Sequence, residues 1–172
     1  KMVSHRKGGI HLKARLFTLV LIFTILLTAC SGGENPKDHL GEIYTLAMDA
    51  LMEEDKALNS DMKFIAIDMS DLDGVDEEQK KTILRHFKNQ YKVEIMNATM
   101  DELEGKGHYN ADTNALEGVL LQIEKVDFTL NDHVLIEGTK FKSGKGAIGL
   151  RMVVEHEDGE WQLKESELSG IS

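Results

Sequence analysis

The only cysteine of this chain, Cys30, lies in a context that suits one particular covalent reaction of its thiol. It directly follows the small residues Thr28 and Ala29, which come after a largely apolar stretch, residues 16–27, and a head with basic residues and no acids. This order is typical of an export signal that ends in a small-residue cleavage site. The apolar stretch has about 12 residues, whereas a permanent transmembrane helix needs ~20. We therefore expect residues 1–29 to direct export and to be removed, and the Cys30 thiol to accept a diacylglyceryl group.

The sequence Leu27-Thr28-Ala29-Cys30 resembles the lipobox of bacterial lipoproteins. The resemblance covers residues 1–30 and implies that Cys30 is acylated and becomes the N-terminus of a protein anchored to the extracytoplasmic face of the cell membrane. Residues 30–35 would then form the lipidated end and a short tether, which spans at most ~18 Å when fully extended. Two alternatives stay open at this point: a buried free cysteine, and a short membrane anchor that is never cleaved.

The charge of the chain narrows the choice of partners. Residues 1–29 contain five of the 20 basic residues and none of the 30 acids, so the remainder carries a formal net charge of −15. Nucleic acid is a poor partner for such a chain because it is bound through clustered Lys and Arg, and anionic lipid headgroups repel it. We expect the lipid anchor to provide the membrane attachment, and an unidentified protein or small molecule to be the partner. Residues 36–172 are enough for a single domain with one core.

The acidic run 68–78 is the strongest candidate for a metal site. Carboxylate oxygens suit calcium, and a glycine supplies the sharp turn of an EF-hand loop. With Gly74 at the sixth place of such a loop, however, the first ligand position falls on Met69 and the last on Lys80, so two ligands are missing. The run is better explained by a capping box at 76–79, and we expect no metal.

Residues 144–149 match the dinucleotide-binding pattern G-x-G-x-x-G, but the context of that motif is missing. The pattern requires a helix directly after the glycines, and here strand-like segments stand on both sides. We therefore expect a glycine-rich bend in a curved sheet, and no cofactor. If the bend has a role, a ligand or partner would contact it together with the loop around residues 108–109. The candidate contact residues are Ser143, Gly144, Lys145, Gly146, His108 and Tyr109.

Catalytic motifs are absent from the sequence. Residues 30–172 contain five histidines, but no His-Glu-x-x-His pair and no Gly-x-Ser-x-Gly elbow. The cluster 155–158 has metal-competent groups, yet consecutive strand residues point to opposite faces of a sheet. We therefore expect a noncatalytic binding or interaction protein. The alternatives are a small-ligand-binding accessory protein of a transporter and an enzyme without a recognisable motif.

Helices dominate the expected structure of the first half. Asn35 and Pro36 are typical of a helix start, and apolar residues at spacings of three and four predict a helix over 36–58. The stretch 63–69 fits either a strand or a connector between helices. The elements expected next are an amphipathic helix after Asp76, a strand over 92–96, a capping box at Thr99 and Glu102 with a short helix to about 104, and a loop over 105–114.

Strands dominate the second half. The alternation of apolar residues shifts by one near 124–125, which predicts a β-bulge, and Asp158-Gly159 predicts a two-residue hairpin turn. We expect Trp161 and Leu163 on one buried face after that turn. The other expected features are a turn at Asn131-Asp132, a strand over 134–141, a break over 144–149 and strands over 150–156 and 161–168.

Together these elements predict an α+β fold in which N-terminal helices pack on a C-terminal antiparallel meander of about four strands. About 55 C-terminal residues, with their long strands and the ending 157–164, resemble the terminal hairpins of cystatin-like and nuclear-transport-factor-like folds. Many small lipoproteins of Gram-positive bacteria adopt such folds. Because these families include enzymes and binding domains, the resemblance does not select a function.

Overall fold

The computed structural model describes residues 34–128 and 133–171. The signal peptide 1–29, the lipidation site Cys30 and the turn at 131–132 lie outside the described residues. Residues from Glu34 to the C-terminus form one compact unit. None of the helices in the described part of the chain combines the length and the apolar character that crossing a bilayer requires.

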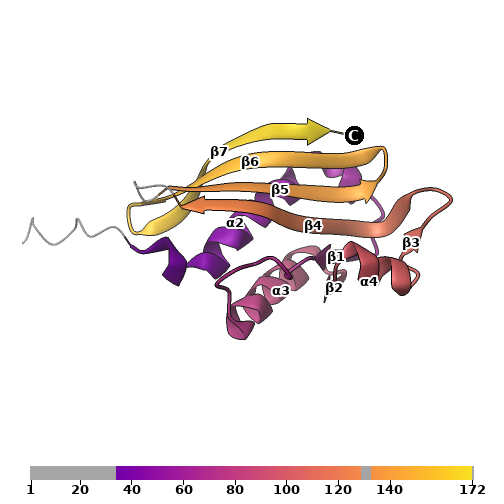
Figure 1. Cartoon of the computed structure of the whole chain (residues 1–172), viewed down its shortest axis with the longest axis horizontal. Helices are drawn as coiled ribbons and strands as arrows, with labels where there is room; N and C mark the ends of the chain where they lie inside the picture. Colours follow the sequence, from indigo (N-terminus) through magenta and orange to yellow (C-terminus); the bar gives the residue numbers. More distant parts are fainter. Residues whose placement is uncertain (1–33, 129–132, 172) are drawn as a thin grey trace, which may run out of the picture. The chain divides into compact units, whose positions relative to one another are not determined.

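Helices and short strands alternate in the first half of the described chain and long strands follow, as expected, except that the loop predicted over 105–114 contains a short strand (Figure 1). The helical elements are η1 (Pro36–Asp38), α2 (Leu40–Glu53), η2 (Lys56–Asn59), α3 (Glu77–Tyr91) and α4 (Met100–Gly105). The strands are β1 (Phe64–Ile67), β2 (Glu94–Asn97), β3 (Tyr109–Asn110), β4 (Ala115–Phe128), β5 (His133–Ser143), β6 (Gly146–Glu157) and β7 (Glu160–Ile171).

The fold class is α+β, but the prediction of about four antiparallel strands was wrong. The described sheet has seven strands in the order β2-β1-β4-β5-β6-β7, with β3 paired to the start of β4. Strand β1 runs parallel to both β2 and β4, while β4 to β7 form the expected antiparallel meander. The sheet is therefore mixed.

Strand β1 explains why the sequence pattern was ambiguous. All four of its residues are buried, because α3 links β1 to the parallel β2 and both faces of the sheet are covered at this point. A strand that is buried on both faces reads as a continuous apolar run without alternation. Such a run has no period by which to distinguish a strand from a helical connector.

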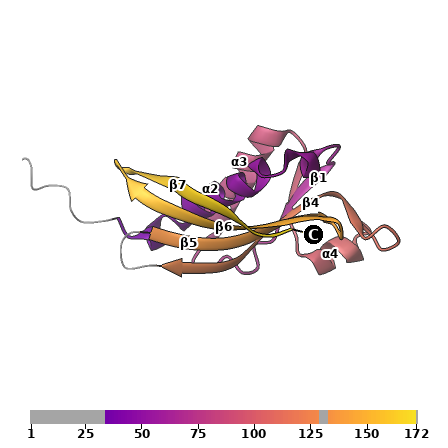
Figure 2. The same cartoon turned by 90° about the horizontal axis from the view of Figure 1, so that it is seen from above.

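Helices cover the two faces of the sheet unequally. Helices α2 and α3 bury the larger core against one face, with side chains such as Ile43, Met48 and Phe87 packed on Ile65, Ile67 and the inner residues of the meander. A smaller cluster with Phe64, Leu103 and Leu120 lies under α4 on the opposite face. Figure 2 shows α3 and α4 on opposite sides of the sheet. The opposite face of the meander itself carries none of the described helices.

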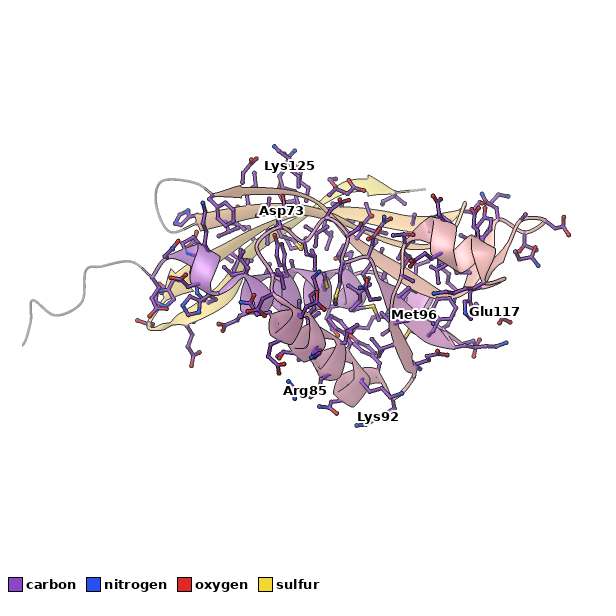
Figure 3. The ribbon with its side chains drawn as sticks, turned by 60° about the horizontal axis from the view of Figure 1, so that its bottom comes forward. Asp73, Arg85, Lys92, Met96, Glu117 and Lys125 are labelled. Carbon is purple, nitrogen blue, oxygen red and sulfur yellow. The ribbon has the colours of Figure 1, made fainter. Side chains whose placement is uncertain are left out.

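That uncovered face carries a row of charged side chains beside half-buried Leu135 and Val153. Lys125, Glu137, Arg151 and Glu167 are paired in register across β4, β5, β6 and β7, so charges of alternating sign form one row. The guanidinium of Arg151 lies 3.2 Å from a carboxylate oxygen of Glu137. Figure 3 shows Lys125 on the far side of the sheet from Arg85, which projects from α3. We therefore call this surface the open face.

The helix expected over 36–58 is divided into three pieces. Helix α2 ends at Glu53, and Asp55 adopts a left-handed backbone conformation with φ 41° before η2 begins. Both capping boxes are confirmed: Asp76 with Gln79 begins α3, and Thr99 with Glu102 begins α4. Short polar side chains fix these helix starts locally, whereas the end of α2 depends on a distant lysine of β5.

The β-bulge near 124–125 and the hairpin turn at Asp158-Gly159 are confirmed. The β4–β5 register shifts between Ile123 and Lys125, and both turn residues have positive φ, 55° and 87°, as a type I′ turn requires. The expected break over 144–149 was wrong in extent, because β6 begins at Gly146. Only 144–145 form the turn, and the later glycines lie within the strand.

Trp161 and Leu163 differ in burial. Trp161 is buried in the larger core, while Leu163 is 37% exposed. Their partners on β6 are His156 and Val154, so both side chains lie on the helix-bearing face as expected. The difference arises because β7 is the last strand of the sheet and extends past the core. The prediction was therefore right about the face and wrong about the burial of Leu163.

Candidate ligand-binding groove between α2 and α3

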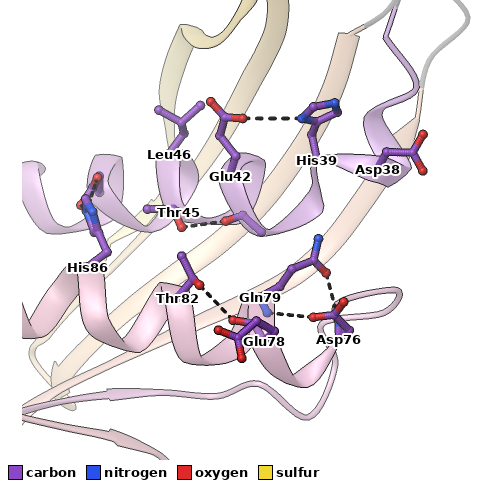
Figure 4. A pocket seen from close by; sticks show the side chains of 12 residues that line it. Asp38, His39, Glu42, Thr45, Leu46, Asp76, Glu78, Gln79, Thr82 and His86 are labelled. Carbon is purple, nitrogen blue, oxygen red and sulfur yellow. Dashed lines mark hydrogen bonds and ion pairs between the residues drawn. The ribbon is translucent and has the colours of Figure 1, made fainter.

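A hollow lies between α2 and α3 (Figure 4). Its volume is about 570 Å³, within the range of pockets that hold small ligands. The lining residues come from the end of η1, from α2, and from α3 with its N-cap. They are Asp38, His39, Gly41, Glu42, Thr45, Leu46, Asp49, Asp76, Glu78, Gln79, Thr82 and His86.

Two contacts fix how the walls of the groove are aligned. A Cβ atom placed on Gly41 would lie 3.2 Å from Cβ of Gln79, so the helices approach closely near their N-terminal ends. Eight residues further along α2, Asp49 accepts from Nε2 of His86, at 3.0 Å and 2.8 Å to its two oxygens. The helices therefore run in the same direction, and the groove extends between these two contacts.

The lining is acidic, and helix electrostatics account for part of this. Five lining residues are Asp or Glu, and none is Lys or Arg. Because α2 and α3 are parallel, both N-termini lie at one end of the groove, where acids stabilise the exposed N–H groups. The Asp76 carboxylate caps α3 by accepting from the Gln79 N–H at 2.8 Å. A bound anion would meet five carboxylates, so the groove favours neutral or cationic ligands.

Asp49 and His86 form an ion pair that joins the two walls of the groove. Burial raises the pKa of the Asp49 carboxyl, and the hydrogen bond and charge of His86 oppose that shift. The pair connects α2 to α3 and closes one end of the hollow. A His–Asp pair is also a familiar general base, provided that a nucleophile lies within reach of the imidazole.

No hydroxyl in the described groove lies in a nucleophile position. Thr45 donates to the Gly41 carbonyl at 2.7 Å, and Thr82 donates to the Glu78 carbonyl at 2.9 Å. Each hydroxyl is thus engaged with its own helix backbone, and its methyl group is left available to an apolar part of a ligand. With half-buried Leu46, these methyls give the groove an apolar component beside its carboxylates.

The structure brings some of the predicted site residues together at the other end of the sheet. Tyr109 donates its hydroxyl proton to Asn114, and the Asn114 carbonyl accepts from the Gly144 N–H at 2.8 Å. Ser143, Gly144 and Lys145 join Thr113 and Asn114 around a hollow of about 310 Å³. This hollow has a single charged lining side chain, that of Lys145, and fewer convergent polar groups than the groove.

The remaining two predicted site residues do not belong to that hollow. The ring of His108 packs on Phe64 with centroids 5.1 Å apart, and its backbone N–H closes the end of α4. Gly146 lies against Leu58 of η2, whose Cδ2 would be 3.0 Å from an added Cβ. Both residues have packing roles in this fold.

The acidic run 68–78 is divided among different environments. Asp68 is buried and accepts from Ser70 and from Gln122, at 2.6 Å and 3.2 Å respectively. Asp71 and Asp73 are exposed, and Asp76 caps α3. Across the ranges 34–128 and 133–171, no three His, Cys, Asp or Glu side chains are grouped as metal binding requires.

Comparison with protein-family models, with curated proteins and with solved structures finds no match to this chain. The geometry of the groove is therefore the basis for its proposed role.

Sequence reasoning missed the groove because its walls come from two helices with no fixed relation in the sequence. A weak signal was present. Gly41, Thr45 and Asp49 recur at intervals of four and place small or polar residues along one side of α2. Gln79, Thr82 and His86, at intervals of three and four, line one side of α3 in the same way. A stripe of this kind indicates a helix side that is neither core nor fully solvated.

Proposed function

We propose that this chain is a lipoprotein anchored at Cys30 on the extracytoplasmic face of the cell membrane, and that its domain binds a ligand without transforming it. The sequence Leu27-Thr28-Ala29-Cys30 supports the anchor. The groove between α2 and α3 supports the binding role and is the observation that carries it. The ligand we propose is a small neutral or cationic molecule that has an aliphatic portion.

Carboxylates and apolar groups side by side in the groove support this ligand class. Carboxylates at the groove would attract an ammonium or guanidinium group, while the methyls of Thr45 and Thr82 and the side chain of Leu46 accommodate methylene groups. The same engagement of the threonine hydroxyls supports binding over catalysis, because it leaves His86 without a nucleophile to activate in the described part of the groove.

Thermal melting with a panel of ligands tests the binding role. Putrescine, spermidine and L-argininamide should raise the Tm of the domain from Glu34 onward at matched ionic strength, and the anion glutarate should not. Thr82→Trp places a large ring in the groove from an exposed position and should abolish the shift. Asn89→Trp, an exposed position on α3 that does not line the groove, should retain it. Amine stabilisation that survives Thr82→Trp would exclude the groove as the site.

The anchor is tested separately by replacing the only thiol. Cys30→Ala should prevent incorporation of a palmitate analogue and release the protein from the membrane fraction. Cys30→Ser is a second variant that keeps a small polar side chain and should behave the same way. Label in either variant would contradict anchoring through Cys30.

A ligand bound by the groove should be recovered unchanged. Mass spectrometry of each stabilising compound after incubation with the domain distinguishes binding from turnover. Loss of the compound with the parent, but not with His86→Gln, would favour the enzyme alternative.

A further inference from the structure

Strand β7 carries an unusual share of the exposed apolar surface. Four large apolar side chains are more than a third exposed in the described residues: Phe128 at 42%, Leu163 at 37%, Leu168 at 52% and Ile171 at 74%. Three of these four belong to β7. Scattered exposed side chains of this type are ordinary, but three on one strand point to a surface that is normally covered.

The exposed leucines continue the core face of the sheet. Leu163 is paired with Val154 and Leu168 with Leu150, and both partners on β6 are buried. The apolar layer that buries Trp161 under α2 therefore continues along β7, where Leu163 and Leu168 are left partly exposed. A neighbouring strand with apolar residues on this face would bury both leucines.

The other side of β7 ends the charged row of the open face. The row alternates in sign from Lys125 through Glu137 and Arg151 to Glu167. Arg151 is bonded to Glu137, so Glu167 at the edge is left without an ion pair among the described residues. Glu165, on the same side, is likewise unpaired there. Continued alternation would place a cation next to Glu167 on an adjacent strand.

The backbone of β7 limits how long such a strand can be. The register with β6 shifts twice, which leaves Lys164 and Ser169 as extra residues on β7. Bulges and an edge lysine are devices that prevent indiscriminate pairing of an edge strand. Between them, Glu165–Leu168 keep a regular register and present one unpaired edge.

Charge disfavours a second copy of the chain as the covering strand. Directly opposite residues of an antiparallel pair share a face. Consider two copies of β7 paired antiparallel. If Ser166 of one copy lay opposite Ser166 of the other, Glu165 would lie opposite Glu167. If the pairing shifted to place Glu167 opposite its own copy, two Glu167 side chains would lie opposite one another on the same face. Like charges directly opposite one another destabilise a strand pair. The edge therefore favours a partner strand that supplies cations.

We propose that Glu165–Leu168 of β7 bind a short extended segment of another protein, in which Lys or Arg alternates with apolar residues. The basic side chains lie opposite Glu165 and Glu167 on the open face, and the apolar side chains cover Leu163 and Leu168 on the core face. Main-chain hydrogen bonds to the free edge provide the remaining affinity, as in other cases of strand addition. This surface is separate from the groove and does not depend on the anchor or on the function proposed for the groove.

Peptide probes test the proposal on the domain from Glu34 onward. The probe is acetyl-Lys-Val-Lys-Val-Lys-Val-amide, and its isomer acetyl-Lys-Lys-Lys-Val-Val-Val-amide has the same charge and composition. We expect the alternating peptide to bind at least about tenfold more tightly than the isomer, by fluorescence anisotropy of labelled peptides. It should also slow hydrogen exchange of the outward-facing amides in 165–168.

Matched variants separate the edge from general charge attraction. Glu167→Lys and Leu168→Lys should each weaken binding at least about tenfold. Glu104→Lys, on exposed α4, repeats the charge reversal, and Phe128→Lys, on β4, replaces another exposed apolar side chain by lysine; each should alter binding by less than about twofold. Circular dichroism of each variant verifies that it is folded.

Three results would overturn the proposal. The first is equal binding of the two isomers, which would show charge attraction without strand recognition. The second is the absence of binding by the alternating peptide to the folded parent. The third is a dimer in sedimentation that Leu168→Lys dissociates, which would make a second copy the occupant of this edge.

Discussion

Nζ of Lys140 lies 3.1 Å from Oδ1 of Asn59, although the two residues are far apart in the sequence. The same ammonium donates to the backbone carbonyls of Met52, Glu54 and Asp55, so a fully buried lysine from β5 closes the C-terminal end of α2. Unpaired carbonyls at a helix C-terminus require such partners, and cations are favoured there by the helix dipole. The end of α2 is thus determined by a strand residue.

Replacing Lys140 by methionine should destabilise the domain. The substitution keeps an unbranched side chain but leaves buried oxygen atoms without a donor, which costs about 2–3 kcal/mol in the free energy of unfolding. Urea denaturation measures this value. Lys142→Met is the matched control, because Lys142 lies two residues further on β5 and donates to the exposed carbonyl of Ser60. A loss below about 1 kcal/mol for Lys140→Met would mean that water replaces the ammonium.

Stability should also depend on pH through Lys140. Burial lowers the pKa of this amine from its ordinary 10.5 to about 8, while the carboxylates of Asp55, Glu54 and Glu53 oppose the shift. Between these two pKa values, Lys140 holds a proton in the unfolded chain and has released it in the folded chain. The free energy of unfolding therefore rises with pH over this range. The advantage of the parent over Lys140→Met should therefore grow from about pH 8 toward pH 10.5. If the stability difference between the parent and Lys140→Met did not change with pH, the surrounding oxygens would be keeping the ammonium charged.

Gly118 should tolerate no side chain. A Cβ atom at this position would lie 2.6 Å from the ring of Phe64 and would also collide with the Phe64 backbone carbonyl. Gly118→Ala should lower the free energy of unfolding by about 3 kcal/mol, because backbone in the central strands cannot move aside cheaply. At Gly170 nothing lies within 4 Å of an added Cβ, so Gly170→Ala is the matched control. Equal melting temperatures for the two variants would refute the close approach of β1 to Gly118.

Trp161 should report directly on the integrity of the core. It is the only tryptophan, it is 4% exposed, and its Nε1 has no acceptor among the described residues. Trp161→Ala should cost about 3–5 kcal/mol. Trp161→Phe keeps an aromatic ring and removes the unpaired N–H, so its cost should be clearly smaller. Fluorescence of the parent should be blue-shifted. A water-exposed emission spectrum, or equal costs for the two variants, would contradict this placement.

Local features of the fold were predictable because neighbouring residues determine them. The capping box at Asp76 and Gln79 requires only a hydrogen bond across three residues, and the Asp158-Gly159 turn requires only positive φ. The bulge near Lys125 was readable because apolar alternation shifts by one residue there. In each case the sequence signal and the physical cause lie within a few positions of one another.

Long-range features were not predictable in the same way. Nothing in the run Phe64–Ile67 specifies that it lies between β2 and β4, since its burial on both faces removes the alternation that marks a strand. The role of Lys140 depends on where α2 ends in space. The groove likewise depends on the parallel alignment that Gly41 and Asp49 make with α3. The lipobox and the cystatin-like resemblance stay predictions.

The ring of His39, just before α2, lies 6.1 Å from that of Trp161 near the start of β7. Helix α2 and strand β7 therefore complete one core, and β1 lacks its second neighbour until β4 is in place. Because β7 is the last of the described elements, the core under α2 closes only when nearly all of the described chain is present. Until then the apolar sides of α2 and α3 are unprotected.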